Sequence, residues 1–217
     1  MTGEAPAPHD PPREFVAAER VRVSLGRTLQ LIASDYNRIC QVMGATSLTR
    51  RLFWTLSPNV VALALYRISH FLHTHHLRFL SWPVYLFNFY LTGADIVPSA
   101  VIGERCFLGH VAGTVICGVV GRDAMLFAAP GIGGGMGSSE DGRPANGLPV
   151  IGDGVLVGAR AMVLGPIFIG NGATIAAGAV VLKDMEPYAT AVGRPPQIVK
   201  TRERSVDYDA VAGIKPE

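Results

Sequence analysis

The chain has 217 residues, of which 49% are hydrophobic and 17% are charged, and its formal net charge is +2. This length suits one or two domains, and the balanced charge gives no reason to expect nucleic acid or an anionic membrane as a partner. The three cysteines lack the spacing of a disulfide framework and no signal peptide is recognisable, so we predict a cytoplasmic protein.

The N-terminal part of the chain is predicted to be helical. Residues 1–13, rich in proline and alanine, are expected to be disordered. Beyond them we expect a helical domain over 14–93, because apolar residues recur at helical spacing. Its predicted helices span 14–43, 48–54, 59–75 and 82–92. The last is apolar but only about half as long as a membrane span, so we interpret it as a buried helix.

Short local signals set the expected ends of these helices. Ser47 suits an N-cap, and Gly93 ends the last helix. His73, His75 and His76 lie at the end of the third helix, where cationic side chains complement the helix dipole. Such a cluster can also bind a metal ion. No cysteine or carboxylate cluster accompanies it, so we predict no metal site.

The second part of the chain carries a six-residue repeat. An aliphatic residue, or once a threonine, recurs at every sixth position and is followed four places later by a small or compact residue. The recurring residues of the first run are Ile96, Ile102, Leu108, Thr114, Val120, Leu126 and Ile132. Those of the second run are Ile151, Val157, Val163, Ile169, Ile175 and Val181. A fixed short period of this kind determines the whole fold.

Each hexad predicts one short strand and a turn, and three hexads close one triangular coil. Coils must stack because no single coil buries its own apolar face. We therefore predict an α+β fold in which the helical domain precedes a parallel β-helix over 94–186. A polar loop at about 136–148 interrupts the repeat, and a tail spans 187–217. The alternative, a β-sandwich with glycine-rich turns, does not account for more than twelve repeats in register.

Several sequence blocks, in a fixed order, carry a family resemblance. Residues 64–70 read Ala-Leu-Tyr-Arg-Ile-Ser-His, residues 93–103 include Asp-Ile-Val-Pro-Ser-Ala-Val-Ile-Gly, and residues 110–116 read His-Val-Ala-Gly-Thr-Val-Ile. Together with 150–183 and 191–199, they resemble the serine O-acetyltransferases of the hexapeptide-repeat acyltransferase superfamily. The resemblance implies a left-handed β-helix, a homotrimer or dimer of trimers, and acyl transfer from acetyl-CoA.

The resemblance also implies a catalytic pair. In the family a histidine on the β-helix acts as general base and an aspartate orients it; His110 and Asp95 occupy the matching positions. A hydroxyl is a poor nucleophile until a base takes its proton, and a carboxylate on the other ring nitrogen fixes the imidazole tautomer. The structural alternatives are a surface histidine satisfied by hydrogen bonds and an aspartate that caps the first coil.

Four departures from the family pattern concern the acceptor. Gly109 replaces the aspartate before the base, and Val97 replaces a histidine. Residues 147–149 lack the family's second histidine, and residues 42–47 lack a carboxylate. In the family these groups hold the charged ends of free serine. A site without them is less suited to a small zwitterion. We therefore expect the acceptor to be the hydroxyl of serine or of a specialised serine-like molecule, including one on a carrier protein.

The donor side matches the family better. Coenzyme A is expected to lie between neighbouring β-helices, against small residues and near basic ones; each small residue is also explained as a coil corner. The candidates for coenzyme binding are Gly134, Gly135, Gly158, Ala159, Ala177, Gly178, Lys183 and Arg194. Two other functions stay open: a non-catalytic scaffold or regulator of a partner enzyme, and a cyclase or lyase that reuses the groove.

Overall fold

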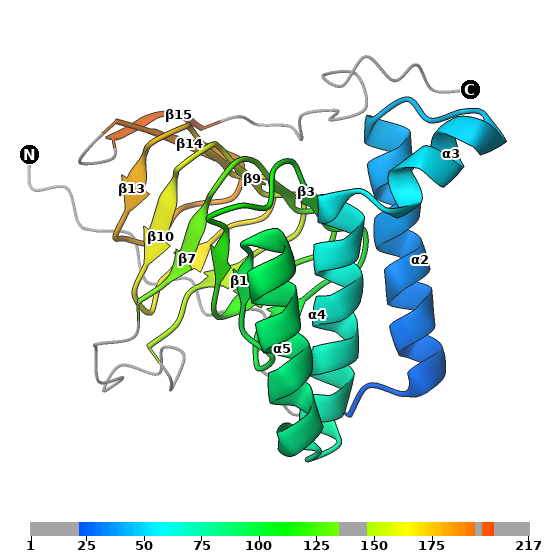
Figure 1. The fold of residues 1–217 in the computed structure, drawn as a ribbon. Coiled ribbons are helices and arrows are strands. Elements are labelled where there is room, and N and C mark those ends of the chain that lie inside the picture. The colour runs from blue at the N-terminus through cyan, green and yellow to red at the C-terminus, as the bar shows by residue number, and fades with distance from the viewer. Residues whose placement is uncertain (1–21, 135–146, 194–196, 202–217) are drawn as a thin grey trace, which may run out of the picture.

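The structure is a computed structural model that describes residues 22–134, 147–193 and, for the backbone, 197–201. The predicted disordered segment 1–13, most of the predicted loop 136–148 and most of the predicted tail 187–217 lie outside the described residues. Figure 1 shows the helices grouped at one end of a stack of short strands, beside β1 and β3.

The described helices are α2 (Leu25–Val42), α3 (Leu48–Thr55), α4 (Pro58–Thr74) and α5 (Arg78–Thr92). The predicted N-cap is confirmed, because the Ser47 hydroxyl accepts a hydrogen bond from the Arg50 N–H at 3.4 Å. The predicted start of the first helix is wrong for the described residues. Residues 22–24 are not helical, and the Ser24 hydroxyl caps α2 by accepting from the Arg27 N–H.

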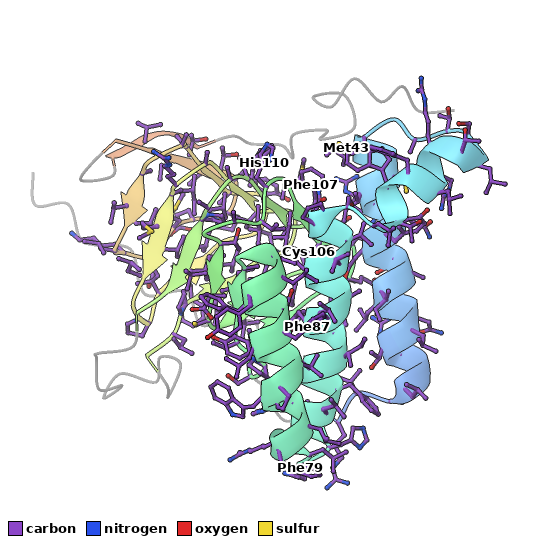
Figure 2. All side chains as sticks on the ribbon, in the orientation of Figure 1. Met43, Phe79, Phe87, Cys106, Phe107 and His110 are labelled. Atoms are coloured by element: carbon purple, nitrogen blue, oxygen red, sulfur yellow. The ribbon has the colours of Figure 1, made fainter. Side chains whose placement is uncertain are left out.

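Helix α5 differs from its prediction in both start and burial. It starts at Arg78 rather than near 82, with Pro83 inside it, and ends as predicted at Gly93 in the left-handed conformation (φ 73°). The predicted burial is wrong for this chain alone: Phe87 is 58% exposed and Tyr90 is 80% exposed. Figure 2 shows Phe79 at the lower end of α5 and Phe87 farther up the same helix. None of the described helices is both long and apolar enough to cross a bilayer.

The strands form three sheets that run along the stack. Sheet A has the order β1 (Asp95–Ile96), β4 (Val115–Ile116), β7 (Gly131–Gly133), β10 (Met162–Leu164) and β13 (Val180–Val181). Sheet B has the order β11 (Phe168–Ile169), β8 (Val150–Ile151), β5 (Val119–Val120) and β2 (Val101–Ile102). Sheet C has the order β15 (Gln197–Thr201), β14 (Ala189–Val192), β12 (Thr174–Ile175), β9 (Leu156–Val157), β6 (Met125–Leu126) and β3 (Phe107–Leu108).

Successive strands pass from sheet A to sheet B to sheet C, so three strands make one coil. Neighbouring strands pair in parallel, except β14 with β15, which are antiparallel. The aliphatic residues of the repeat point into the prism: Ile132, Ile151 and Val157 from one coil are each fully buried. The predicted fold class, a helical domain followed by a left-handed parallel β-helix, is confirmed.

The repeat register is wrong at one position, Thr114. On sheet A the inward residue that pairs with Ile96 and Ile132 is Ile116, two places later. Thr114 is also buried, but it lies in the turn before β4. The next corner is correspondingly two residues shorter, because only Cys117 and Gly118 separate β4 from β5. The turn that carries residues 109–114 is therefore longer than the four-residue turns below it.

The open end of the prism is capped by side chains from the helices. The Arg67 side chain donates hydrogen bonds to the carbonyl oxygens of Ile102 and Gly103 in the first coil. The Tyr66 hydroxyl accepts from the Ile102 N–H at 3.2 Å and donates to the Ala100 carbonyl at 2.7 Å. An uncovered strand edge presents unpaired backbone groups. These bonds satisfy them without an additional strand.

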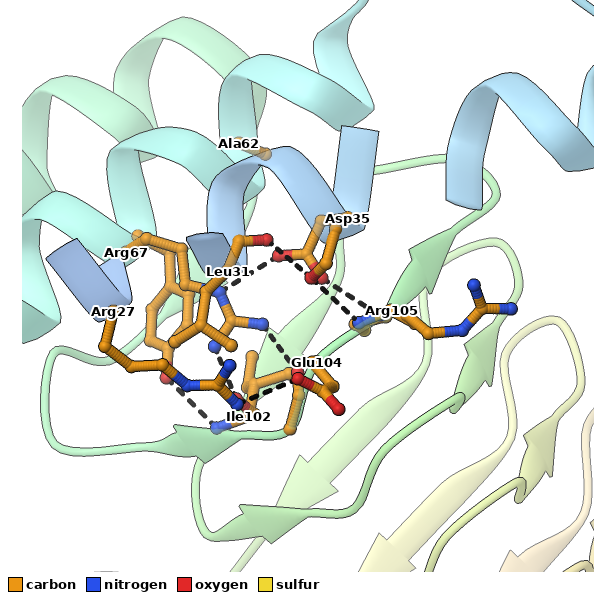
Figure 3. Close-up of polar contacts among 12 residues, drawn as sticks. Arg27, Leu31, Asp35, Ala62, Arg67, Ile102, Glu104 and Arg105 are labelled. Atoms are coloured by element: carbon orange, nitrogen blue, oxygen red, sulfur yellow. Dashed lines mark hydrogen bonds and ion pairs between the residues drawn. The ribbon is translucent and has the colours of Figure 1, made fainter. Parts of the chain in front are cut away.

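The Arg67 guanidinium is held by a buried carboxylate. Its Nε lies 3.0 Å from Asp35 Oδ2, and both side chains are 2% exposed (Figure 3). The other oxygen of Asp35 accepts from the Cys106 N–H at 3.0 Å. Burial raises the pKa of the Asp35 carboxyl, although the Arg67 charge and the hydrogen bonds oppose that shift. Burial lowers the pKa of Arg67, but the charge and hydrogen bond of Asp35, together with Tyr66 and Cys106, outweigh burial, so that pKa is raised overall.

We predict that Arg67→Met destabilises the protein by about 3–5 kcal/mol, because it leaves a buried carboxylate and two carbonyl groups without their partner. The matched control is Arg27→Met, which removes a 2.8 Å ion pair with Glu104 that is 49% and 31% exposed. We expect that control to cost less than about 1 kcal/mol. Urea unfolding followed by circular dichroism measures both, and equal losses would contradict the account.

Candidate functional site

One corner of the prism gathers five of the ten predicted site residues. Here the chain passes from sheet C to sheet A, and we call this the C-to-A corner. His110 lies in its first turn, between β3 and β4. Gly158 and Ala159 lie in its third turn, and Ala177 and Gly178 lie in its fourth. Because the coils stack about 4.8 Å apart, the four turns form one column.

Close backbone contacts hold the lower turns of this corner together. The Gly178 N–H donates to the Ala159 carbonyl at 2.8 Å. A Cβ added at Gly158 would lie 2.5 Å from the backbone nitrogen of Ala177. Glycine at 158 is therefore required by the stacking of two coils, whether or not a ligand binds. The coenzyme-binding role of these four residues stays a prediction.

The His110 side chain is exposed at the top of the column (Figure 2). Its carbonyl accepts from the Thr114 hydroxyl at 3.3 Å. The Thr114 carbonyl in turn accepts from the Asp95 N–H at 2.8 Å. Asp95 and His110 are thus both hydrogen-bonded to Thr114, Asp95 through its N–H and His110 through its carbonyl. Within the described part of the chain, however, no hydrogen bond joins their side chains, so their pairing stays a prediction.

Instead, the partner of the Asp95 carboxylate is Tyr85. The Tyr85 hydroxyl of α5 donates to Asp95 Oδ1 at 2.8 Å. Burial and the hydrogen bond to Asp95 raise the pKa of Tyr85 to about 12. Sequence reasoning missed this residue, because no motif marks it and its partner lies in another element. The only available signal was its position on the polar side of a largely apolar helix.

The outer face of sheet A surrounds Asp95 with small and apolar side chains. Val115 pairs with Asp95 and is 37% exposed, and Met162 farther along is 38% exposed. Cys117 is half-buried two residues beyond Val115. Burial, and next the Asp95 carboxylate, raise the pKa of the Cys117 thiol. Cys117 is therefore a neighbour of the candidate site that the sequence had not indicated.

Two further predicted residues, Lys183 and Gly134, lie away from the C-to-A corner. Lys183 is exposed just after β13, and Gly134 follows β7 with φ 85°. Both lie in turns from sheet A to sheet B, whereas His110 lies in a turn from sheet C to sheet A. The width of sheet A therefore separates them from His110. Gly135 and Arg194 lie outside the described residues. Among the residues that the structure describes, no group of three or more His, Cys, Asp or Glu side chains is placed to hold a metal ion.

Two repeat families match the prism. Residues 149–183 match the family described as "Bacterial transferase hexapeptide (six repeats)". Residues 99–126 match the family described as "Hexapeptide repeat of succinyl-transferase". Both matches fall within the coils described above.

Longer relatives extend the similarity into the helices. A serine acetyltransferase from Mycobacterium tuberculosis is 40% identical over 144 residues, which are 65% of this chain and 61% of the relative. The chain thus spans about three fifths of that protein. A serine acetyltransferase from Helicobacter pylori is 35% identical over 151 residues, which are 69% of this chain and 85% of the relative.

Solved structures agree with the described fold. The serine acetyltransferase of Neisseria gonorrhoeae in complex with serine has a TM-score of 0.69 at 28% identity, covering 79% of this chain and 69% of that one. Soybean serine acetyltransferase complexed with serine has a TM-score of 0.70 at 30% identity, with the same coverage.

We predict that Cys117 is the thiol of the native protein that reacts with Ellman's reagent, since Cys40 and Cys106 are buried. Because its pKa is raised, the rate should still be rising above pH 9. Asp95→Asn removes a nearby negative charge, lowers that pKa and should speed the reaction at pH 8 by about threefold. Asp123→Asn, on another corner, is the control. An unchanged rate in Asp95→Asn would show that the carboxylate and the thiol are not neighbours.

Proposed function

The chain belongs to the serine acetyltransferase family, and we propose that it transfers an acetyl group from acetyl-CoA to the hydroxyl of serine. The serine acetyltransferase relatives support this activity, and the C-to-A corner supports its location. The observation that carries the proposal is the placement of His110 at the head of the column that also holds Gly158, Ala159, Ala177 and Gly178.

In the proposed reaction His110 is the general base and Asp95 orients it. His110 takes the proton of the serine hydroxyl while the oxygen attacks the thioester carbonyl. The carbon–sulfur bond then breaks, and the proton passes to the departing thiolate of coenzyme A. Asp95 would hold the other ring nitrogen and stabilise the imidazolium. The exposure of the His110 side chain leaves it open to both substrates.

For the donor, we propose that the pantetheine follows the C-to-A corner of one prism, with the phosphates near Lys183 and Arg194 of a neighbouring prism, because sheet A separates Lys183 from this corner within one chain. Small residues allow close approach of a ligand to the backbone. This arrangement needs a second prism alongside the first, and we expect a homotrimer or a dimer of trimers. The exposed apolar side of α5 is available for such packing. A cytoplasmic location stays a prediction.

A larger, less charged acceptor is the second candidate, and it rests on Gly109. A Cβ added there would lie 3.4 Å from the Phe127 Cα and from its ring. The position before the base therefore faces an aromatic ring and carries no carboxylate for a substrate ammonium group. The apolar residue Val115, which pairs with Asp95 on the outer face of sheet A, also favours an acceptor with fewer charges.

We predict that the purified protein releases thiol from acetyl-CoA when L-serine is added, and that His110→Ala lowers kcat by about 100-fold or more. The matched control is His76→Asn, which replaces a histidine that has a left-handed backbone (φ 62°) on the turn after α4. Binding of acetyl-CoA should persist in both variants. Full activity of His110→Ala would disprove the assigned base. A wild-type protein that binds acetyl-CoA but acetylates no alcohol or amine would favour the alternative function, a non-catalytic scaffold or regulator of a partner enzyme.

We predict that Gly109→Asp raises kcat/KM for L-serine by about tenfold, because a carboxylate beside the base pairs with the substrate ammonium. The space near Phe127 admits a side chain. Gly109→Asn is the isosteric neutral control, and N-acetyl-L-serine, which has no ammonium group, is the control substrate. If free serine is already the preferred acceptor of the wild type and Gly109→Asp does not improve it, the second candidate fails.

A further inference from the structure

The side of α5 that faces α4 and the prism is polar. Ser81, Tyr85, Asn88 and Thr92 are spaced by four, three and four residues, so they lie on one side of the helix. Ser81, Asn88 and Thr92 are buried. The Ser81 hydroxyl donates to the Ser69 carbonyl at 2.8 Å, and the Asn88 amide donates to the Ala62 carbonyl at 3.0 Å.

These bonds fix α5 against α4 on both sides of Tyr85. They join Ser81, one turn before Tyr85, and Asn88, about one turn after it, to two carbonyl groups of the preceding helical segment. The Trp82 ring also packs edge-on against the Tyr85 ring, with 5.1 Å between centroids. The phenol is therefore presented from a rigid segment toward one fixed point on β1.

That point is the Asp95 carboxylate. Ile96 faces the core of the prism, so its neighbour Asp95 faces outward on sheet A. Ser81 and Asn88 donate to carbonyl groups of α4, and the Thr92 hydroxyl donates to the Asn88 carbonyl at 2.8 Å. Tyr85, in contrast, bonds an outward side chain of the prism. A tyrosine needed only for packing would not require a partner of this kind.

We propose that Tyr85 is a positioning residue for acetyl transfer, which holds Oδ1 of Asp95 so that Oδ2 is directed to the His110 imidazole. This inference rests on the proposed function, because it presumes that Asp95 orients the base. A carboxylate has lone pairs for several donors, so the phenol and the imidazole can share it. A chain of such bonds fixes each member more tightly than one bond alone.

Tyr85 remains a donor throughout the range in which acyl transfer would be measured. Its pKa is raised to about 12, by burial first and by the hydrogen bond to Asp95 next. The groups that face it are Asp95 and, more distantly, Cys117, which directly follows β4. The Tyr85 hydroxyl therefore keeps its proton and can donate to Asp95 at neutral and mildly alkaline pH.

The test is a double-mutant cycle on the full chain. Its members are the wild type, Tyr85→Phe, Asp95→Ala and the double variant. Tyr90→Phe is the matched control, since it removes a hydroxyl from the same helix at an 80% exposed position. Two experiments are made on each variant. Steady-state kinetics give kcat for acetyl transfer and KM for acetyl-CoA, and peptide mass spectrometry gives the rate at which diethyl pyrocarbonate modifies His110.

We expect Tyr85→Phe to lower kcat about tenfold without changing KM for acetyl-CoA, and to slow modification of His110 about threefold. Tyr90→Phe should change neither. In the Asp95→Ala background Tyr85→Phe should have no further effect, because its action passes through Asp95. Equal effects in both backgrounds, or no effect on either quantity, would overturn the inference. If the wild type acetylates no acceptor, the proposed function fails, but the His110 modification cycle still decides the inference about Tyr85.

Discussion

The structure depends on the capping of the first coil by the helical domain. A stack of parallel coils satisfies its backbone groups internally but leaves one edge unpaired at each end. Arg67, Tyr66 and Asp35 satisfy that edge with side chains, and Arg67 is itself neutralised by Asp35 at 3.0 Å. Because this contact is buried, a shift of α4 would break several hydrogen bonds at once. The helices are thus fixed relative to the prism.

The same constraint positions the candidate site. Helix α4 is fixed by the cap, α5 is fixed on α4 by Ser81 and Asn88, and Tyr85 then reaches Asp95 at 2.8 Å. The C-to-A corner begins in the coil that is capped, so His110 lies at the junction of the two parts of the molecule. In this account Tyr66 and Arg67 serve stability first. They affect acetyl transfer only through α5, which carries Tyr85.

Much of the fold was predictable from the sequence because the repeat has a strict physical cause. Ile132, Ile151 and Val157 were all assigned to the core correctly. The shift from Thr114 to Ile116 was not predictable, because Thr114 keeps the six-residue period in the sequence although it lies in a turn that is two residues longer than the others at the same corner. Burial of α5 was predicted wrongly because its buried side is polar. Tyr85 could not be found, because its partner is defined only when helix and strand are packed.

The central claim is that acetyl transfer takes place at the head of the C-to-A corner. A crystal structure of the protein with coenzyme A and L-serine tests it most directly. The account predicts the serine hydroxyl within hydrogen-bond distance of His110, with the pantetheine along Gly158, Ala159, Ala177 and Gly178. Coenzyme A bound at another corner of the prism, or on the helical domain, would contradict it.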